Sequence, residues 1–133
     1  MLTPEKFNQL DPFTRGYLEC ALFTNEPDEL VESGAYHQKP EWNATMFSPE
    51  ALREAEADCL AFYTLYKPQF IALEDDLEME DMGRLLWYDR NGHGVGYWSE
   101  DLGDVGDVLS AAADAIGTCD LYSGDDGKLY FSR

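Results

Sequence analysis

The run LLWYDRNGHGVGYWS, residues 85–99, decides which fold the sequence predicts. Aromatic and aliphatic residues fill 85–88 and recur over 95–99, on either side of the dipeptide Asn91-Gly92. Asn and Gly both tolerate a positive φ, so this dipeptide is typical of a tight turn between two strands. We therefore expect a β-hairpin here, with alternate glycines leaving one face of its second arm bare.

The C-terminal segment predicts a second hairpin and, before it, a helix. Residues 120–123 and 128–132 are rich in strand-forming side chains, and the Asp125-Asp126-Gly127 sequence between them suits a turn. The helix is expected over 102–116, with Gly117 as its C-terminal cap. Its apolar face is formed by Leu102, Val105, Val108, Leu109, Ala112 and Ile116. The C-terminal half is thus expected to be β-β-α-β-β.

The first half of the chain predicts helices. Thr3-Pro4, Asp11-Pro12 and Ser48-Pro49 each place an N-cap side chain before a proline that suits the first helical position. The second pair opens an apolar face that continues to about residue 23. The third opens a long helix, which Pro68 should end or kink near residue 66. Residues 25–47 lack a clear period and predict an extended or partly ordered connection.

These elements predict a single α+β domain spanning residues 1–133, large enough to bury a core. The N-terminal helices would pack on a small antiparallel sheet made of two hairpins with an intervening helix. Cys20, Cys59 and Cys119 form no C-x-x-C pair, which favours reduced, buried thiols in a cytosolic protein. Met1 is followed by neither a basic region nor an apolar signal core, and no stretch could span a bilayer, so we expect a soluble cytoplasmic protein.

The chain is strongly acidic, with 27 Asp and Glu residues against 9 Lys and Arg and a net charge of -18. The part after residue 73 holds 15 of the acids and 4 of the bases. Two groups stand out, which we call the acidic run and the aspartate face. The acidic run comprises Glu74, Asp75, Asp76, Glu78, Glu80 and Asp81. The aspartate face lies opposite the apolar face of the 102–116 helix and comprises Asp101, Asp104, Asp107 and Asp114.

This charge bears on the kind of partner the protein can bind. A surface this negative repels nucleic acid and anionic membranes and favours a basic protein surface. Carboxylates three or four residues apart on a helix lie about 5–6 Å from one another, a spacing comparable with that of phosphates along a nucleic-acid strand. We therefore expect both acidic groups to contact a nucleic-acid-binding protein, as a nucleic-acid mimic. The alternative is a solvated surface that only keeps the protein soluble.

The predicted 85–99 hairpin carries the polar residues for a second hypothesis, a small enzyme or metal-binding protein centred on His93. These residues are Asp89, Arg90, Asn91, His93, Tyr97 and Trp98. Neither His37 nor His93 has a second His or Cys at ligand spacing, which disfavours zinc, and the Asp-containing turns lack a complete calcium loop. The G-x-G-x-G run lacks the strand–turn–helix context of a dinucleotide site. We expect no catalytic residue, no metal and no cofactor.

A third hypothesis is a self-associating structural protein, which would make the chain a homodimer or larger assembly. An exposed patch of Trp and Tyr side chains would support it, because contiguous apolar surface marks an interaction site. The sequence leaves this alternative open.

Three stretches resemble a widespread family of small acidic proteins encoded by bacteriophages and prophages. They are residues 87–98, the sequence LGDVG at 102–106 and the sequence LYSGDDGKLY at 121–130. The family shows a phrase similar to R-N-G-H-G-x-G-[FY]-W and an ending similar to Y-x-G-D-D-G-K-[IL]-Y. Where the family usually has His-Asp-Phe before the Trp, this chain has Arg84-Leu85-Leu86. Any chemistry based on that His-Asp pair is therefore not implied here.

The resemblance implies a phage origin and expression in the cytoplasm of a bacterial host. The family has no established biochemical activity, so the resemblance implies no reaction. Together with the charge, it predicts an accessory protein of host takeover that binds a basic, nucleic-acid-handling host or phage protein, for example as an anti-defence inhibitor.

Overall fold

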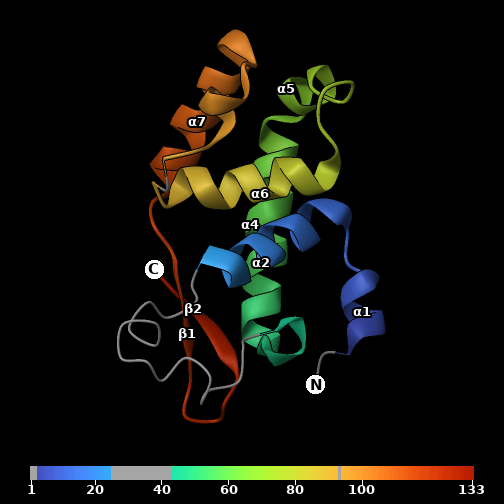
Figure 1. Cartoon of the computed structure of the whole chain (residues 1–133), viewed down its shortest axis with the longest axis vertical. Coiled ribbons are helices and arrows are strands. Elements are labelled where there is room, and N and C mark those ends of the chain that lie inside the picture. The colour runs from blue at the N-terminus through green and yellow to red at the C-terminus, as the bar shows by residue number, and fades with distance from the viewer. Residues whose placement is uncertain (1–2, 25–42, 93) are drawn as a thin grey trace.

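The computed structural model describes residues 3–24, 43–92 and 94–133 (Figure 1). The elements are α1 (Pro4–Asn8), α2 (Pro12–Thr24), η2 (Ala44–Met46), α4 (Pro49–Leu65), α5 (Lys67–Ala72), α6 (Met79–Arg90), η3 (Tyr97–Glu100), α7 (Gly103–Ile116), β1 (Asp120–Ser123) and β2 (Leu129–Ser132). Helices form most of the described chain and one small antiparallel sheet follows them, which confirms the α+β class. Most of the connection predicted over 25–47 lies outside the described residues.

The three predicted helix starts are confirmed, because each N-cap side chain accepts a hydrogen bond from a free backbone amide. Thr3 Oγ1 accepts from the Lys6 amide at 3.2 Å, Asp11 Oδ1 from the Thr14 amide at 3.0 Å, and Ser48 Oγ from the Ala51 amide at 3.0 Å. The long helix α4 ends at Leu65, as the position of Pro68 predicts. The chain then turns into α5 rather than leaving the helical conformation.

The prediction of a β-hairpin over residues 85–99 is wrong. Residues 79–90 form helix α6, and the second aromatic stretch forms the short 3-10 helix η3. Met82, Leu85, Leu86 and Asp89 are all buried, at a spacing of three, one and three residues that suits a helix and not a strand. Gly92, with a φ of 65°, follows the C-cap of α6, so the tolerance of glycine for positive φ ends a helix here instead of turning a hairpin.

The acidic run supplies the start of this helix. Glu78 is the N-cap of α6, and the Asp81 carboxylate accepts a hydrogen bond from the Glu78 amide at 3.4 Å. Glu80 and Asp81 lie in the first turn, where negative charge is stabilised by the free amides and the helix dipole. The run is therefore in part a helix-start signal.

The C-terminal hairpin and the helix before it are confirmed. Strands β1 and β2 pair antiparallel, with Leu121 opposite Phe131 and Tyr122 opposite Tyr130. The hairpin joins the body of the protein where the Ser48 amide donates to the carbonyl of Leu129 at 2.9 Å. The two strands are the only sheet in the described residues, so the half after residue 78 is α6-η3-α7-β1-β2 rather than β-β-α-β-β.

One predicted detail of α7 is wrong. Val108 and Ile116 remain 44% and 38% exposed, although the sequence placed them on the buried face. The fully buried positions are Gly106, Leu109 and Ala113 instead. The carbonyl oxygen of Tyr97 would lie 2.7 Å from a Cβ at position 106, so η3 packs closely against α7 at Gly106.

The core is built around the crossing of α2 and α6. A Cβ on Gly16 would lie 2.0 Å from the carbonyl oxygen of Glu80, and one on Gly83 would lie 1.9 Å from that of Phe13. The two helices thus meet backbone to backbone. Trp87 is fully buried beside this crossing, its ring in edge contact with Tyr17 and its indole N–H donating to Thr24 Oγ1 at 2.7 Å.

The elements are drawn out along one long axis (Figure 1). The long helix α4 follows this axis, and α2 and α6 lie across it in the view. Helix α7 and helix α5 lie at the upper end of the molecule, and the turn of the β1–β2 hairpin lies at the lower end. The two ends therefore offer separate surfaces.

Candidate functional site

The polar residues of 89–98 form a structural network. Asp89 is 9% exposed, and its Oδ2 accepts hydrogen bonds from the Tyr97 amide at 2.9 Å and from Ser110 Oγ at 2.6 Å. Ser110 Oγ in turn accepts from the Trp98 amide at 2.9 Å. A Cβ on Gly96 would lie 2.4 Å from the carboxyl carbon of Asp89. Of the three glycines on the bare face that the sequence predicts, Gly96 is covered by this carboxylate, whereas Gly92 and Gly94 have open space beside them. Through these bonds Asp89 holds η3 and α7 to α6.

Arg90 connects α6 to α2, to α4 and to the residue that follows α7. Its side chain is buried, with Nε donating to the carbonyl of Gly117 at 2.9 Å and Nη1 to the Tyr17 hydroxyl at 2.9 Å and to Asp58 Oδ2 at 3.2 Å. Asp58 also forms an ion pair with Arg133, so the C-terminus is held in the same network. Burial raises the pKa of Tyr17, which keeps its hydroxyl neutral beside the guanidinium. Among the residues that the structure describes, Nη2 of Arg90 has no hydrogen-bond partner.

The other residues of the cluster predicted around His93 do not converge on one site. The side-chain amide of Asn91 donates to the carbonyl of Trp87 at 3.0 Å, and its Oδ1 accepts from the Cys119 amide at 2.7 Å, which closes the C-terminal end of α6. The Trp98 side chain is 54% exposed. His93 lies outside the described residues. The contacts of Asp89, Arg90 and Asn91 thus hold elements of the fold together.

The three cysteines are free and buried, as the sequence predicts. Burial raises the pKa of Cys20 to about 11 and raises the pKa of Cys59 well above its ordinary value. Their thiols are therefore protonated at neutral pH, a state in which a thiol is a poor nucleophile. In the described residues, no group of three His, Cys, Asp or Glu side chains is placed to hold a metal ion.

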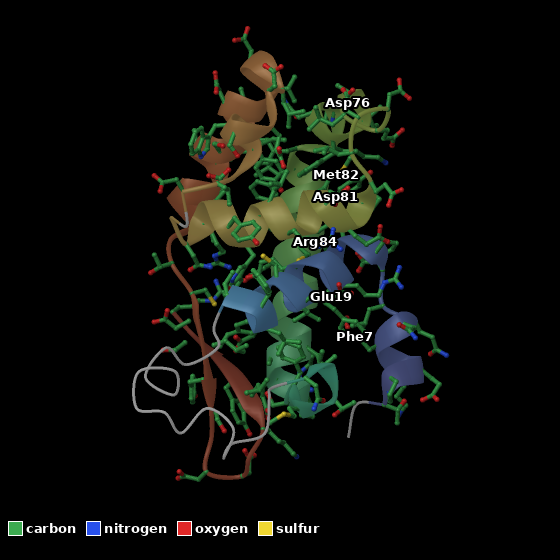
Figure 2. The ribbon with its side chains drawn as sticks, in the orientation of Figure 1. Phe7, Glu19, Asp76, Asp81, Met82 and Arg84 are labelled. Carbon is green, nitrogen blue, oxygen red and sulfur yellow. The ribbon has the colours of Figure 1, made fainter. Side chains whose placement is uncertain are left out.

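The acidic run divides into two parts. Glu74, Asp75 and Asp76 form the exposed turn between α5 and α6, and the exposed Glu78 follows. Figure 2 shows Asp76 at the upper end of the molecule, away from Asp81. The last two acids of the run, Glu80 and Asp81, form ion pairs and are partly buried. These pairs join Arg15 to Glu80 at 3.2 Å and Arg84 to Asp81 at 2.7 Å.

Arg84 also reaches Glu19 on α2 at 3.7 Å, beside its pair with Asp81 (Figure 2). The Arg15–Glu80 and Arg84–Glu19 pairs hold α2 and α6 together around the backbone crossing, whereas the Arg84–Asp81 pair lies within α6. Glu80 and Asp81, which the sequence assigned to a partner surface, thus pair with basic residues of the protein itself.

The aspartate face is different, because its charges stay open to solvent. Asp101, Asp104, Asp107 and Asp114 are all exposed, and none of their carboxylates has a hydrogen bond or ion pair with the described residues. Asp101 has a left-handed backbone with a φ of 56° and ends η3, and Asp104 lies in the first turn of α7. The sequence therefore placed Asp104, Asp107 and Asp114 correctly on the exposed side of α7, whereas Asp101 precedes the helix instead of belonging to it.

The exposed part of the acidic run and the start of the aspartate face share one end of the molecule. The α5–α6 connection and the beginning of α7 both lie at the upper end in Figure 1. We call this region the acidic end, comprising Glu74, Asp75, Asp76 and Glu78 together with Asp101, Asp104 and Asp107. Asp114 lies near the other end of α7, where the Gly117 carbonyl accepts a hydrogen bond from Arg90 of α6. The sequence indicates both groups, and only the folded chain brings them to the same end.

Comparison of the chain with protein-family models, with curated proteins and with solved structures found no match. No helix in the described ranges is long and apolar enough to cross a membrane. The resemblance to phage-encoded proteins stays a prediction.

Proposed function

We propose that the chain is a binding protein whose acidic end engages the basic surface of a nucleic-acid-handling protein. The observation that carries this proposal is the contrast between two sets of carboxylates. Those near the α2–α6 crossing pair with Arg15 and Arg84, whereas the four of the aspartate face have no partner in the described residues. Unpaired carboxylates on a packed helix are open to cations of another protein.

The spacing of the aspartate face supports nucleic-acid mimicry. A helix rises about 1.5 Å per residue, so Asp104 and Asp114, the first and last of the three that lie on α7, are about 15 Å apart along its axis. A nucleic-acid strand carries about four phosphates over that length, one per roughly 3.4 Å. Three carboxylates over the same length give a charge density of similar order, on a helix held in place by η3 and α6.

The partner class follows from the sign and density of this charge. Proteins that bind nucleic acid present Lys and Arg clusters to phosphates, and a row of carboxylates competes for the same side chains. A phage accessory protein that occupies such a groove, as the sequence resemblance implies, would redirect or inhibit a host or phage nucleic-acid-binding protein.

A pair of charge-matched variants tests the proposal. The first changes Asp101, Asp104, Asp107 and Asp114 to Asn; the control changes the exposed Glu5, Glu54, Glu56 and Asp120 to their amides, so that both lose four charges. Each protein is immobilised and exposed to the heparin-retained fraction of a bacterial lysate. An exposed ion pair contributes roughly 0.2–1 kcal/mol, so losing four should weaken capture by about fourfold or more.

The control variant should retain most of the binding. Capture by the native chain should also weaken as salt rises, because the Debye length falls to about 8 Å at physiological ionic strength. Equal losses in the two variants would show that only net charge matters, and unchanged capture by the first variant would refute the proposed interface.

A further inference from the structure

The outer face of the C-terminal hairpin carries two stacked tyrosines. Tyr122 and Tyr130 are opposite each other in the β1–β2 register, and their rings stack with centroids 5.8 Å apart and an interplanar angle of 27°. Opposite residues of an antiparallel pair point to the same face. Leu121 and Leu129, on the other face, are buried in the core. The hairpin thus turns an aromatic surface toward solvent, with Tyr122 47% exposed.

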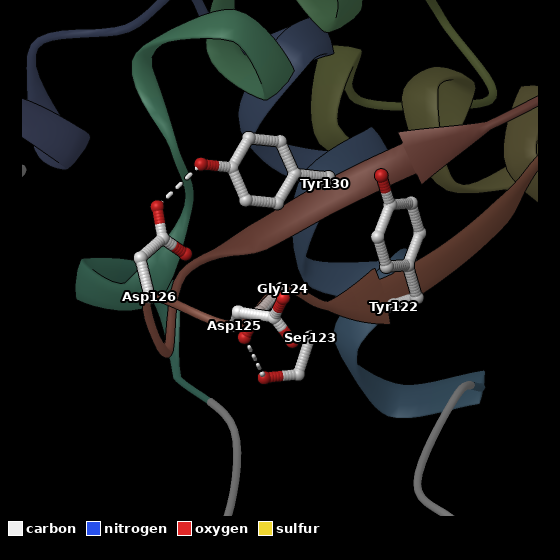
Figure 3. A pocket seen from close by; sticks show the side chains of 6 residues that line it. All are labelled: Tyr122, Ser123, Gly124, Asp125, Asp126 and Tyr130. Atoms are coloured by element: carbon white, nitrogen blue, oxygen red, sulfur yellow. Dashed lines mark hydrogen bonds between the residues drawn. The ribbon is translucent and has the colours of Figure 1, made fainter.

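A surface pocket of about 460 Å³ lies beside these rings (Figure 3). Its walls are Tyr122, Ser123, Gly124, Asp125, Asp126 and Tyr130. The turn below it is held by hydrogen bonds from the Gly124 amide to the Lys128 carbonyl at 2.8 Å and from the Gly127 amide to the Gly124 carbonyl at 3.0 Å. A Cβ on Gly124 would lie 2.7 Å from the ring of Tyr130, so this glycine lets the ring lie close over the turn.

The pocket combines these rings with fixed negative charge. The Tyr130 hydroxyl donates to Asp126 Oδ2 at 2.5 Å, and Asp126 Oδ1 accepts from the Lys128 amide at 2.9 Å. Asp125 is exposed and has no hydrogen bond or ion pair with the described residues. Lys128 is the one basic residue between 120 and 132, so the two carboxylates at the turn outnumber the local positive charge.

We propose that this pocket binds the guanidinium group of an arginine side chain presented by a partner protein. A guanidinium is flat, so it can stack on a tyrosine ring while its N–H groups donate to a carboxylate. Asp125 supplies the carboxylate, since Asp126 is already engaged by Tyr130 and by the Lys128 amide. The net charge of -18 favours approach of a basic partner.

This site is distinct from the acidic end. The hairpin turn and the start of α7 lie at opposite ends of the long axis (Figure 1), and no residue belongs to both. The proposal that this pocket binds arginine can therefore be tested independently of the proposed function.

The test is an NMR titration of the ¹⁵N-labelled full chain with acetyl-Gly-Arg-Gly-amide. We expect saturable amide shifts confined to residues 122–130, with a dissociation constant in the range of about 10–100 mM, as suits one cation–π contact and one exposed ion pair. The citrulline peptide, which keeps the shape and loses the charge, should give no saturable shift. The lysine peptide should bind about threefold or more weakly than the arginine peptide, because its ammonium cannot stack as a plane.

Two variants assign the contacts. Asp125→Asn and Tyr122→Leu should each weaken arginine binding by about threefold or more, while the dispersion of the remaining amide signals confirms that both proteins fold. The aspartate-face variant should bind the arginine peptide like the native chain, which separates this site from the proposed function. Shifts centred on α7, equal binding of citrulline and arginine, or tighter binding of free spermidine than of the arginine peptide would each overturn the assignment.

Discussion

Asp89 and Ser110 are joined by a hydrogen bond of 2.6 Å between the carboxylate and the serine hydroxyl, and this bond links α6 to α7 across 21 residues of sequence. The same carboxylate oxygen accepts the Tyr97 amide at 2.9 Å. One buried acid therefore fixes the path of the chain through η3 and the position of the helix that carries the aspartate face.

Replacing this acid should destabilise the fold. Asp89→Ala would leave the buried amide of Tyr97 and the hydroxyl of Ser110 without their acceptor, at a cost of about 2–4 kcal/mol in the free energy of unfolding. Urea denaturation followed by circular dichroism measures the change. Asp114→Asn, on the exposed side of α7, is the control and should change stability by less than about 0.5 kcal/mol. Equal stabilities for the two variants would contradict the role assigned to Asp89.

The α2–α6 crossing should not tolerate a methyl group. Gly16→Ala adds a Cβ that would lie 2.0 Å from the Glu80 carbonyl oxygen, so the helices must separate. Alanine favours a helix over glycine by about 1 kcal/mol, yet overpacking costs about 1–3 kcal/mol or more, so the net effect should be destabilising. Thr64→Ala at an exposed position of α4 serves as control. A thermal midpoint for Gly16→Ala equal to or above that of the native chain would disprove the close crossing.

Arg90 and Tyr17 should behave as a coupled pair. Arg90→Met removes the donor to Tyr17, Asp58 and the Gly117 carbonyl, and breaking one side of a buried ion pair costs about 3–5 kcal/mol. Tyr17→Phe removes one hydrogen bond and should cost about 1 kcal/mol. Because the two share an interaction, the double variant should be less destabilised than the sum of the singles. Strict additivity in a urea double-mutant cycle would show that the 2.9 Å contact contributes nothing.

The Tyr130–Asp126 hydrogen bond should be visible in an alkaline titration. The bond to Asp126 raises the pKa of Tyr130 from 10.0 to about 12, because the neutral phenol is the donor. Its contribution to stability is therefore complete below about pH 10 and is lost as pH rises through about 12. The same bond lowers the pKa of Asp126, so at the acid end the contribution is present above the ordinary value of 3.8 and is lost as pH falls through the lowered value.

Specific ¹³C labelling of the tyrosine Cζ atoms would measure this titration, with Tyr130→Phe assigning the signal. Asp126→Asn should bring the pKa of Tyr130 back toward 10.0, while Asp125→Asn, the neighbouring carboxylate, should leave it nearly unchanged. A Tyr130 signal that titrates identically in the native chain and in Asp126→Asn would show that Tyr130 does not donate a hydrogen bond to Asp126.

The sequence by itself determined those features that depend on neighbouring residues. Ser48-Pro49 starts α4, Asp125-Asp126-Gly127 turns the C-terminal hairpin, and the three-residue spacing of Asp104 and Asp107 places them on the same side of α7. Capping, turn geometry and helical periodicity act within a few residues, so their signals can be read along the chain.

Only the tertiary structure decided the conformation of residues 85–99 and which of the carboxylates form ion pairs within the protein. Aromatic residues before Asn91-Gly92 fit either a strand before a turn or the last turn of a helix. The backbone contact of Gly83 with Phe13 and the bonds from Asp89 to η3 and α7 favour the helix. Likewise, Glu80 pairs with Arg15 of α2 at the crossing, while the Asp104 side chain has no partner among the described residues. These outcomes depend on packing between distant segments, which no local pattern encodes.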